Sequence, residues 1–280
     1  MNFDQFAYPL EAYGLPSREE MLDYRIWDDH YHGIDQHEEV MRYVTRLGIE
    51  RVISLDIGGR EYREKAHREI LEKQRDRVLG IIRIDPSRPE ESVAKMEQWI
   101  RNGPCIGIKY AGGNEGVTCS HPNNDPIISL ARELKAVVYI HAWIKVGGNP
   151  RRLGGDNGKS ESSPMDVAIL AKRFPDVPMT CGHSGGDWEI GARVVRPYEN
   201  VNFEFAGSDP HSGQVDYAIK ILGEDRIVWG GHGPSRCLAN ELSKILDANL
   251  TKEQRMKVFG RNLRRVCAPI MRQKGYSVKI

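Results

Sequence analysis

The chain has 280 residues, 40% of them hydrophobic, and its charged side chains nearly cancel to a formal net charge of +1. This balance argues against a nucleic-acid binding protein, whose surface usually carries a concentrated basic patch. No apolar run approaches the ~18 residues that a membrane span needs. The N-terminus lacks a basic start followed by an apolar stretch, so we expect no signal peptide. Five cysteines, an odd number without a C-x-x-C pair, predict reduced, mostly buried thiols in a cytoplasmic protein.

Short apolar runs alternate with charged, amphipathic stretches along most of the chain. Residues 1–24 are predicted to be an N-terminal extension with one short helix, which a capping box at Ser17–Glu20 would open. The apolar runs predict eight strands, at residues 25–30, 51–56, 78–83, 105–110, 137–141, 177–183, 201–205 and 226–230. The stretches between them predict helices, at about residues 37–47, 89–100, 126–134, 164–174, 188–195, 213–222, 237–248 and 252–268. A further charged helix is predicted after the second strand, ending at about residue 75. Residues 143–163, rich in Gly, Asn and Ser, predict a long loop.

Strands that alternate with helices indicate βαβ units and a parallel sheet. Eight such units in this length fit a closed barrel better than an open doubly wound sheet. An open sheet that binds a dinucleotide would also need a G-x-G-x-x-G turn after its first strand, where Asp29–His32 stands instead. We therefore predict an α/β fold, a single (β/α)8 TIM barrel over residues 25–280 with an extra C-terminal helix.

Five of the nine histidines fall at the carboxyl ends of predicted strands. His30 and His32 follow the first strand, and residues two apart on a strand share a face, so both imidazoles can aim at one point. His141, His183 and His232 end or follow the fifth, sixth and eighth strands. A lone H-x-H could be a surface pair, but in a barrel all these ends converge on the mouth where catalytic residues lie. The pattern predicts a mononuclear metal site with an open position for water.

Other polar residues have less specific patterns. His37 and His67 lie on predicted helices among charged residues, so we expect ordinary solvated side chains. Glu204 alternates with Phe203 and Phe205 on the seventh strand and is expected to face the barrel interior or the mouth. A buried carboxylate needs a partner, which Lys109 or an arginine could supply.

The chain also resembles the amidohydrolase superfamily, and within it the amidohydrolase-related branch of metal-dependent hydrolases that includes decarboxylases of aromatic and unsaturated acids. The motifs that carry the resemblance are Asp28–His32, Gly107–Lys109, Tyr139–His141, Cys181–Gly186 and Gly260–Leu263. The resemblance implies that His30, His32 and His141 hold a divalent metal. It implies that His183 is either a further ligand or a hydrogen-bond donor to the substrate carbonyl. Lys109 stands where some relatives carry a carbamylated, metal-bridging lysine, although in this branch the lysine more often contacts substrate.

One departure from the family motif lies after the eighth strand. The family has Gly-Ser/Thr-Asp-x-Pro there, and its aspartate binds metal and moves the proton of the attacking water. This chain has Gly230-Gly231-His232-Gly233-Pro234, with His232 in the aspartate's place. A neutral histidine leaves the metal centre more positive, which lowers the pKa of bound water. The open alternatives are a working site with His232 as base, an altered metal preference, or a site that binds without turnover.

Three further residues are candidates for substrate binding. Asp209 follows the seventh strand and could supply the missing carboxylate, or it could cap the turn before Pro210. Arg236 could pair with a substrate carboxylate or phosphate, or form an ordinary surface salt bridge. Trp143 begins the long loop, which could form a lid.

We therefore predict a metal-dependent hydrolase that acts on an amide, ester or lactone carbonyl of a small, acidic molecule through metal-activated water. His232 would take the proton of the water, with His183 beside the metal. The expected cofactor is one divalent ion, first Zn, with Mn, Fe or Ni as alternatives. Non-hydrolytic decarboxylation, or a barrel that binds metal or ligand without turnover, are the other functions considered. The resemblance implies that homo-oligomers are common, and no nucleic-acid or membrane partner is expected.

Overall fold

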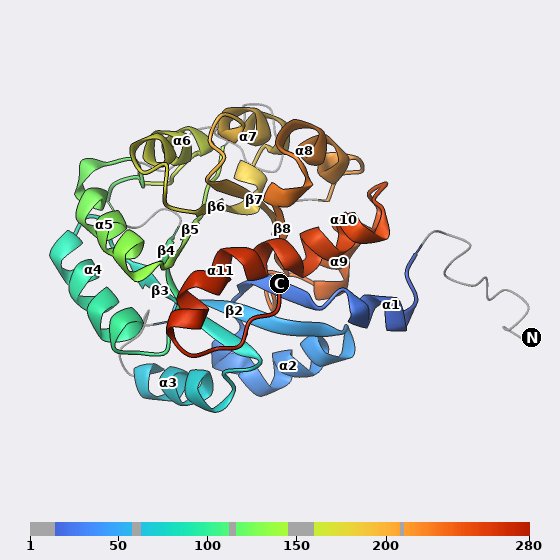
Figure 1. Ribbon diagram of the computed structural model, residues 1–280, viewed down its shortest axis with the longest axis horizontal. Helices are drawn as coiled ribbons and strands as arrows, with labels where there is room; N and C mark the ends of the chain where they lie inside the picture. Colours follow the sequence, from blue (N-terminus) through green and yellow to red (C-terminus); the bar gives the residue numbers. More distant parts are fainter. Residues whose placement is uncertain (1–14, 58–62, 112–115, 145–159, 208–209) are drawn as a thin grey trace, which may run out of the picture.

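The computed structural model describes residues 15–57, 63–111, 116–144, 160–207 and 210–280. Its eight strands form one parallel sheet in sequential order, which curves into a ring (Figure 1). The strands are β1 (Ile26–Tyr31), β2 (Ile49–Ile57), β3 (Val78–Ile84), β4 (Gly107–Tyr110), β5 (Val137–Ile140), β6 (Met179–Cys181), β7 (Val201–Phe205) and β8 (Ile227–Trp229). The chain after β8 returns to β1, where the N–H of His32 donates to the carbonyl of Gly233 (2.8 Å). The predicted (β/α)8 barrel is confirmed.

A ring of helices surrounds the strands, as each strand leads into a helix on the outside of the barrel (Figure 1). The helices are α1 (Arg18–Asp23), α2 (His37–Arg46), α3 (Glu64–Lys73), α4 (Pro89–Met96), α5 (Asp125–Leu134), α6 (Pro164–Arg173), α7 (Trp188–Val195), α8 (Gln214–Leu222), α9 (Leu238–Leu246), α10 (Lys252–Met256) and α11 (Asn262–Gln273). Short 3₁₀ turns are η3 (Gly33–Gln36), η6 (Pro122–Asn124), η7 (Gly182–Gly185) and η8 (Glu224–Arg226), and π turns are η5 (Glu97–Arg101) and η9 (Lys257–Arg261). Capping boxes start two helices, Ser163 with Asp166 at α6 and Thr251 with Gln254 at α10.

The largest difference from the predicted elements lies at the sixth strand. Residues 177–183 were expected to be extended, but β6 covers only Met179–Cys181. The backbone then enters η7, where His183 and Ser184 have φ values of 55° and 48°. Left-handed conformations of this kind leave no pattern in the side-chain polarity, so the hydrophobic periodicity of the strand could not predict them.

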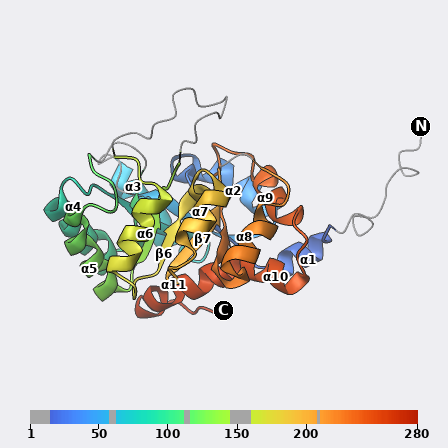
Figure 2. The same cartoon turned by 90° about the horizontal axis from the view of Figure 1, so that it is seen from above.

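The end of the barrel at which the strands begin is covered by η9 and α11. Helix α11 crosses the centre of the ring in Figure 1 and lies along one edge of the molecule in Figure 2. Gly260 packs so closely that a Cβ there would lie 2.4 Å from the carbonyl oxygen of Arg25. Arg264 Nη1 donates to the same carbonyl (2.6 Å), and Asn262 Nδ2 donates to the carbonyl of Ile227 at the start of β8 (2.8 Å). The expected extra C-terminal helix therefore forms a floor for the barrel.

The expectation that His37 and His67 are solvated is wrong, because their exposed fractions are only 7% and 4%. His37 Nε2 lies 2.9 Å from Gln74 Oε1, and His67 Nε2 lies 3.0 Å from Asp35 Oδ1. These polar partners on neighbouring segments make burial of the imidazoles acceptable.

The cysteines agree with the expected pattern, as all are free thiols and all except Cys237 are buried. None of the helices in the described ranges has the length and apolar character needed to cross a bilayer. Tyr24, the residue that follows helix α1 in the predicted N-terminal extension, stacks its ring on that of Phe259 in η9 at 5.5 Å. The domain boundary at residue 24 stays a prediction.

Candidate metal centre

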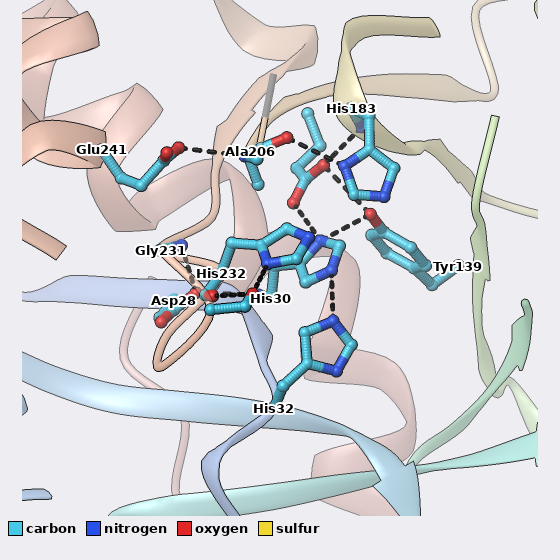
Figure 3. A network of polar contacts seen from close by, with 12 residues as sticks. Asp28, His30, His32, Tyr139, His183, Ala206, Gly231, His232 and Glu241 are labelled. Carbon is cyan, nitrogen blue, oxygen red and sulfur yellow. Dashed lines mark hydrogen bonds and ion pairs between the residues drawn. The ribbon is translucent and has the colours of Figure 1, made fainter. Parts of the chain in front are cut away.

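The end of β1 delivers two imidazoles to the mouth of the barrel. The register with β2 shifts between Asp28 and Tyr31, so three residues of β1 advance while β2 advances by two. The Asp28 carboxylate fixes this irregular segment, since its Oδ1 accepts the N–H groups of His30 (2.8 Å) and Gly231 (2.6 Å). His30 and His32 meet as the sequence predicts, with their Nε2 atoms 2.9 Å apart (Figure 3).

The third imidazole, that of His183, comes from the left-handed turn after β6. Ser184, Gly185 and Gly186 continue this turn with positive φ values. For residues other than glycine, a left-handed backbone costs roughly 1–2 kcal/mol, and such strain tends to gather at functional sites. The turn is held in place where the N–H of Ile144 donates to the carbonyl of Gly185 (2.8 Å). His183 Nδ1 lies 2.9 Å from the carbonyl of Ala206.

The fourth imidazole is that of His232, which also has a positive φ of 52°. Its ring stacks on that of His30, with centroids 4.2 Å apart and an interplanar angle of 18°. Its Nδ1 lies 2.5 Å from Ser235 Oγ, which itself donates to the carbonyl of His232. Ligand nitrogens of His30, His183 and His232 all lie within 4.8 Å of one another. Within the described ranges this is the one grouping of three or more such ligands.

The outer hydrogen bonds of these rings indicate which nitrogen carries the proton. The Nδ1 atoms face acceptors: Glu204 Oε1 at 2.9 Å from His30, Asp56 beside His32, the carbonyl of Ala206 beside His183, and Ser235 Oγ beside His232. We infer from this network that Nδ1 is protonated in each ring and that each Nε2 presents a lone pair. Two Nε2 acceptors 2.9 Å apart repel each other unless a cation lies between them. With metal–nitrogen bonds of ~2.0–2.1 Å, one ion can reach both.

Burial sets the charge of the cluster. Burial lowers the pKa of His30 and of His183 well below the usual value, and the neighbouring imidazoles lower it further. Burial also lowers the pKa of His232 to about 3, so all three rings are neutral near pH 7 and keep their lone pairs. Neutral imidazoles are the form that binds a transition metal.

Glu204 lies behind His30 and is completely buried. Its carboxylate accepts hydrogen bonds from the backbone N–H of His183 (2.8 Å) and the hydroxyl of Tyr139 (3.1 Å). Burial nevertheless raises its pKa to about 8, because these donors do not replace water completely. A cation among the imidazoles would supply the missing positive charge, as in the carboxylate–histidine–metal arrangement of many metal sites. The residues therefore fit a divalent metal.

The structure places most of the other candidates beside this cluster. The His141 ring centroid lies 4.5 Å from that of His183, and its Nε2 is 3.6 Å from Glu161 Oε1. The Trp143 ring centroid lies 5.9 Å from that of His183. Lys109 is buried on β4, with Nζ 5.8 Å from the centre of the Tyr139 ring. The ligand role predicted for His141 stays a prediction.

Two further substrate-binding candidates, Arg236 and Asp209, stay predictions. Arg236 is exposed and lines a cavity of about 410 Å³ together with residues of α2 and the start of α9, among them Tyr43 and Leu238. Asp209 lies outside the described residues, so its two alternative roles stay predictions.

Sequence reasoning singled out only one of the groups that orient the imidazoles. Glu204 was expected to pair with a cation, but its partners are His30, Tyr139 and the His183 amide. Asp56 and Ser235 were not singled out at all. Asp56 does stand at the end of its strand, where mouth residues gather, and that position was an available signal.

Comparisons with known proteins identify the family of the chain. The model of the amidohydrolase family matches residues 30–266, which is most of the chain. The chain belongs to this amidohydrolase family. No curated protein matches the chain.

Among solved structures, the chain is similar to several decarboxylases. It resembles 2,6-dihydroxybenzoate decarboxylase from Rhizobium with a TM-score of 0.66 and 15% identity, over 87% of this chain and 98% of that one. It resembles 5-carboxyvanillate decarboxylase from Sphingomonas paucimobilis with a TM-score of 0.64 and 15% identity, over 82% of both chains. For dihydroxybenzoic acid decarboxylase from Polaromonas, whose structure holds manganese and the inhibitor 2-nitroresorcinol, the TM-score is 0.64 at 15% identity over 92% of both chains. At such identities the likeness shows the fold alone.

Proposed function

We propose that the four imidazoles of His30, His32, His183 and His232 hold one divalent metal ion, and that the protein is a metal-dependent decarboxylase of a small carboxylic acid. The observation that carries the proposal is the position of His232. Its ring stacks on that of His30, and its ligand nitrogen lies in the same cluster. With the inferred Nε2 lone pair on His232, all four proposed ligands are neutral imidazoles. The similar structures named above are decarboxylases, and one of them holds manganese, which supports the same choice.

Hydrolysis is the second candidate, and it needs a group that removes a proton from water. The predicted base is His232, but burial lowers its pKa to about 3, so the ring holds a proton poorly near neutral pH. The carboxylates of Glu204 and Asp56 face the outer Nδ1 atoms of His30 and His32. They are thus suited to orient the imidazoles. This arrangement favours a ligand role for His232 over a base.

The charge of the site favours an anionic substrate. A shell of neutral imidazoles does not offset the two positive charges of the ion. Arg83 on β3 and Lys109 on β4 are register partners, and Lys109 is the register partner of Tyr139 on β5. Partners in a parallel sheet share a face, so both cations stand on the same side as Tyr139, whose hydroxyl reaches His30 Nδ1 (2.7 Å). We assign substrate carboxylate recognition to Arg83 and Lys109.

When bound, the metal would stabilise the negative charge that develops on the substrate as carbon dioxide leaves. In this reaction a C–C bond breaks, the electron pair stays on the substrate carbon, and a proton must then form the new C–H bond. We assign delivery of this proton to His141, which pairs with Glu161 at the edge of the cluster. Trp143, stacked beside His141 at 6.4 Å, would exclude water from the reacting carbon.

The test uses protein reconstituted with Mn²⁺ or Zn²⁺ and two panels of compounds. Aromatic and unsaturated carboxylic acids are assayed for carbon dioxide, in D₂O so that the new C–D bond is visible. Amides, esters and lactones are assayed in H₂¹⁸O. We expect carbon dioxide and deuterated product from a member of the first panel, with about one equivalent of metal.

Incorporation of ¹⁸O without carbon dioxide release would instead show a hydrolase. Less than about half an equivalent of metal after reconstitution would refute the metal site. His121→Ala is the matched control, because His121 is exposed and lies outside the cluster.

A further inference from the structure

The backbone of Gly207 lies close to the imidazole ring of His232. A Cβ built on Gly207 would lie 2.2 Å from Cδ2 and 2.7 Å from Nε2 of His232. Gly207 also has a φ of 68°, a conformation that favours glycine. The peptide after β7 can therefore touch the imidazole face only because residue 207 has no side chain. The His232 ring therefore has two close neighbours, this peptide and the ring of His30.

A buried carboxylate on α9 holds Gly207 in this place. The N–H of Gly207 donates to Glu241 Oε2 (3.0 Å), and the side chain of Glu241 points toward this part of the chain in Figure 3. Lys244 Nζ donates to the same oxygen at 2.7 Å. The exposed fractions of Glu241 and Lys244 are only 1% and 4%. The backbone is anchored as well, since Trp229 Nε1 donates to the carbonyl of Glu241 (2.9 Å).

A buried ion pair of this kind needs an explanation, because desolvation of the two charges often costs more than their attraction returns. An apolar pair of the same size would attach α9 to the barrel equally well. It could not, however, accept the N–H of Gly207. The only bond of the Glu241 side chain that leads toward the metal centre is the one to this amide, among the contacts of the described residues.

We propose that Glu241 is a positioning residue for His232, and that it acts through the amide of Gly207. Lys244 donates to the same oxygen and so keeps the carboxylate aimed at that amide. The chain of contacts runs from α9 through the β7 terminus to the imidazole, and it fixes the direction of His232 Nε2. This inference rests on the proposed metal centre, whose ligand it positions.

Two double variants separate this role from a merely structural one. Glu241→Gln with Lys244→Met removes both charges but keeps an amide oxygen for the Gly207 N–H. Glu241→Leu with Lys244→Met also removes both charges and leaves that N–H without an acceptor. Co²⁺ is the probe, because its visible spectrum reports the arrangement of its ligands, and its dissociation constant is measured by competition with a chelator.

We expect the leucine variant to bind Co²⁺ about 10–100-fold more weakly, the usual effect of losing an orienting partner, with shifted absorption bands. The glutamine variant should stay within about threefold of the natural protein, since it retains the hydrogen bond. Leu242→Ala is the control for lost stability, because Leu242 is buried on the same helix. It should lower the melting temperature and leave the spectrum unchanged. If the two double variants behave alike, or if the leucine variant keeps the natural affinity and spectrum, the proposal is wrong.

A metal-free measurement separates failure of this inference from failure of the metal site. NMR signals of the Gly207 amide and the His232 ring are recorded without metal for both double variants. The His232 signals should move only in the leucine variant, whether or not the natural protein binds Co²⁺. Should the leucine variant not fold, Gly207→Ala tests the same contact, since its methyl group would displace the His232 ring and weaken Co²⁺ binding.

Discussion

The two ends of the barrel bring together different kinds of buried polar groups. At the floor, side-chain donors serve backbone carbonyls: Arg264 binds the carbonyl of Arg25, Asn262 binds that of Ile227, and Lys274 binds that of Gly103. At the mouth, imidazoles pair with carboxylates, His30 with Glu204 and His32 with Asp56.

Left-handed backbone occurs at both ends but is adjacent to the ligand candidates only at the mouth. Among the described residues, His183, Ser184 and His232 have positive φ at the mouth, and Arg25 and Lys135 have it just before β1 and β5. The imidazoles and carboxylates gathered at one end, with helix-to-carbonyl contacts at the other, indicate that the floor stabilises the fold while the mouth serves chemistry. Substitutions at the two ends should therefore separate function from stability.

Of the substitutions considered, His30→Ala is expected to have the largest effect on metal binding and turnover. His30 contacts His32, His232 and Glu204, so its loss removes the centre of the cluster. We expect metal content below about half an equivalent, and a loss of turnover above the ~10–100-fold that an orienting partner alone is worth. Metal analysis and the carbon dioxide assay measure both quantities. Full metal content in this variant would contradict the proposed centre.

His141→Ala should separate proton delivery from metal binding. If His141 delivers the proton, turnover falls by ~10²–10⁴-fold while metal content stays near one equivalent. The predicted ligand role has another signature, since loss of a ligand would release the metal together with the activity. Metal content and turnover measured on the same sample distinguish the two roles.

Glu204→Gln should change how the metal-free protein responds to pH. Burial raises the pKa of Glu204 from 4.5 to about 8. Between these values the folded protein retains a proton that the unfolded chain has lost, so the free energy of unfolding of the metal-free protein falls as pH rises through this window. The glutamine variant should show a flatter profile in urea unfolding from pH 5 to 8.

The same variant should bind metal about 10–100-fold more weakly, because the carboxylate behind His30 is gone. If the free energy of unfolding of the variant falls with pH as steeply as that of the natural protein, Glu204 is not the group responsible for the pH dependence. Asp28 is the nearest competing explanation, since burial raises its pKa to about 7.

How much the sequence could predict differs between the two ends as well. The alternation of apolar runs and amphipathic stretches is imposed by burial of every strand, so the eight-stranded barrel could be predicted. The strand-end position of His30, His32, His183 and His232 could be predicted for the same reason. The bulge in β1 and the left-handed turn at His183 depend on local backbone geometry that side-chain polarity does not encode. The link from Glu241 to His232 through a backbone amide is likewise invisible in the chain order.

The smallest expected effect belongs to the floor. Asn262 is 2% exposed, and its Nδ2 donates to the carbonyls of Glu224 (2.7 Å) and Ile227 (2.8 Å). Asn262→Ala leaves these carbonyls without their donor, which should lower the free energy of unfolding by ~1–3 kcal/mol. Metal content and turnover per folded molecule should stay unchanged, because Asn262 lies at the end of the barrel opposite the histidines.

Asn240→Ala, on the exposed side of α9, is the control and should change stability by less than ~0.5 kcal/mol. Loss of metal in the Asn262 variant would mean that the floor also shapes the mouth, and the separation between the two ends would fail.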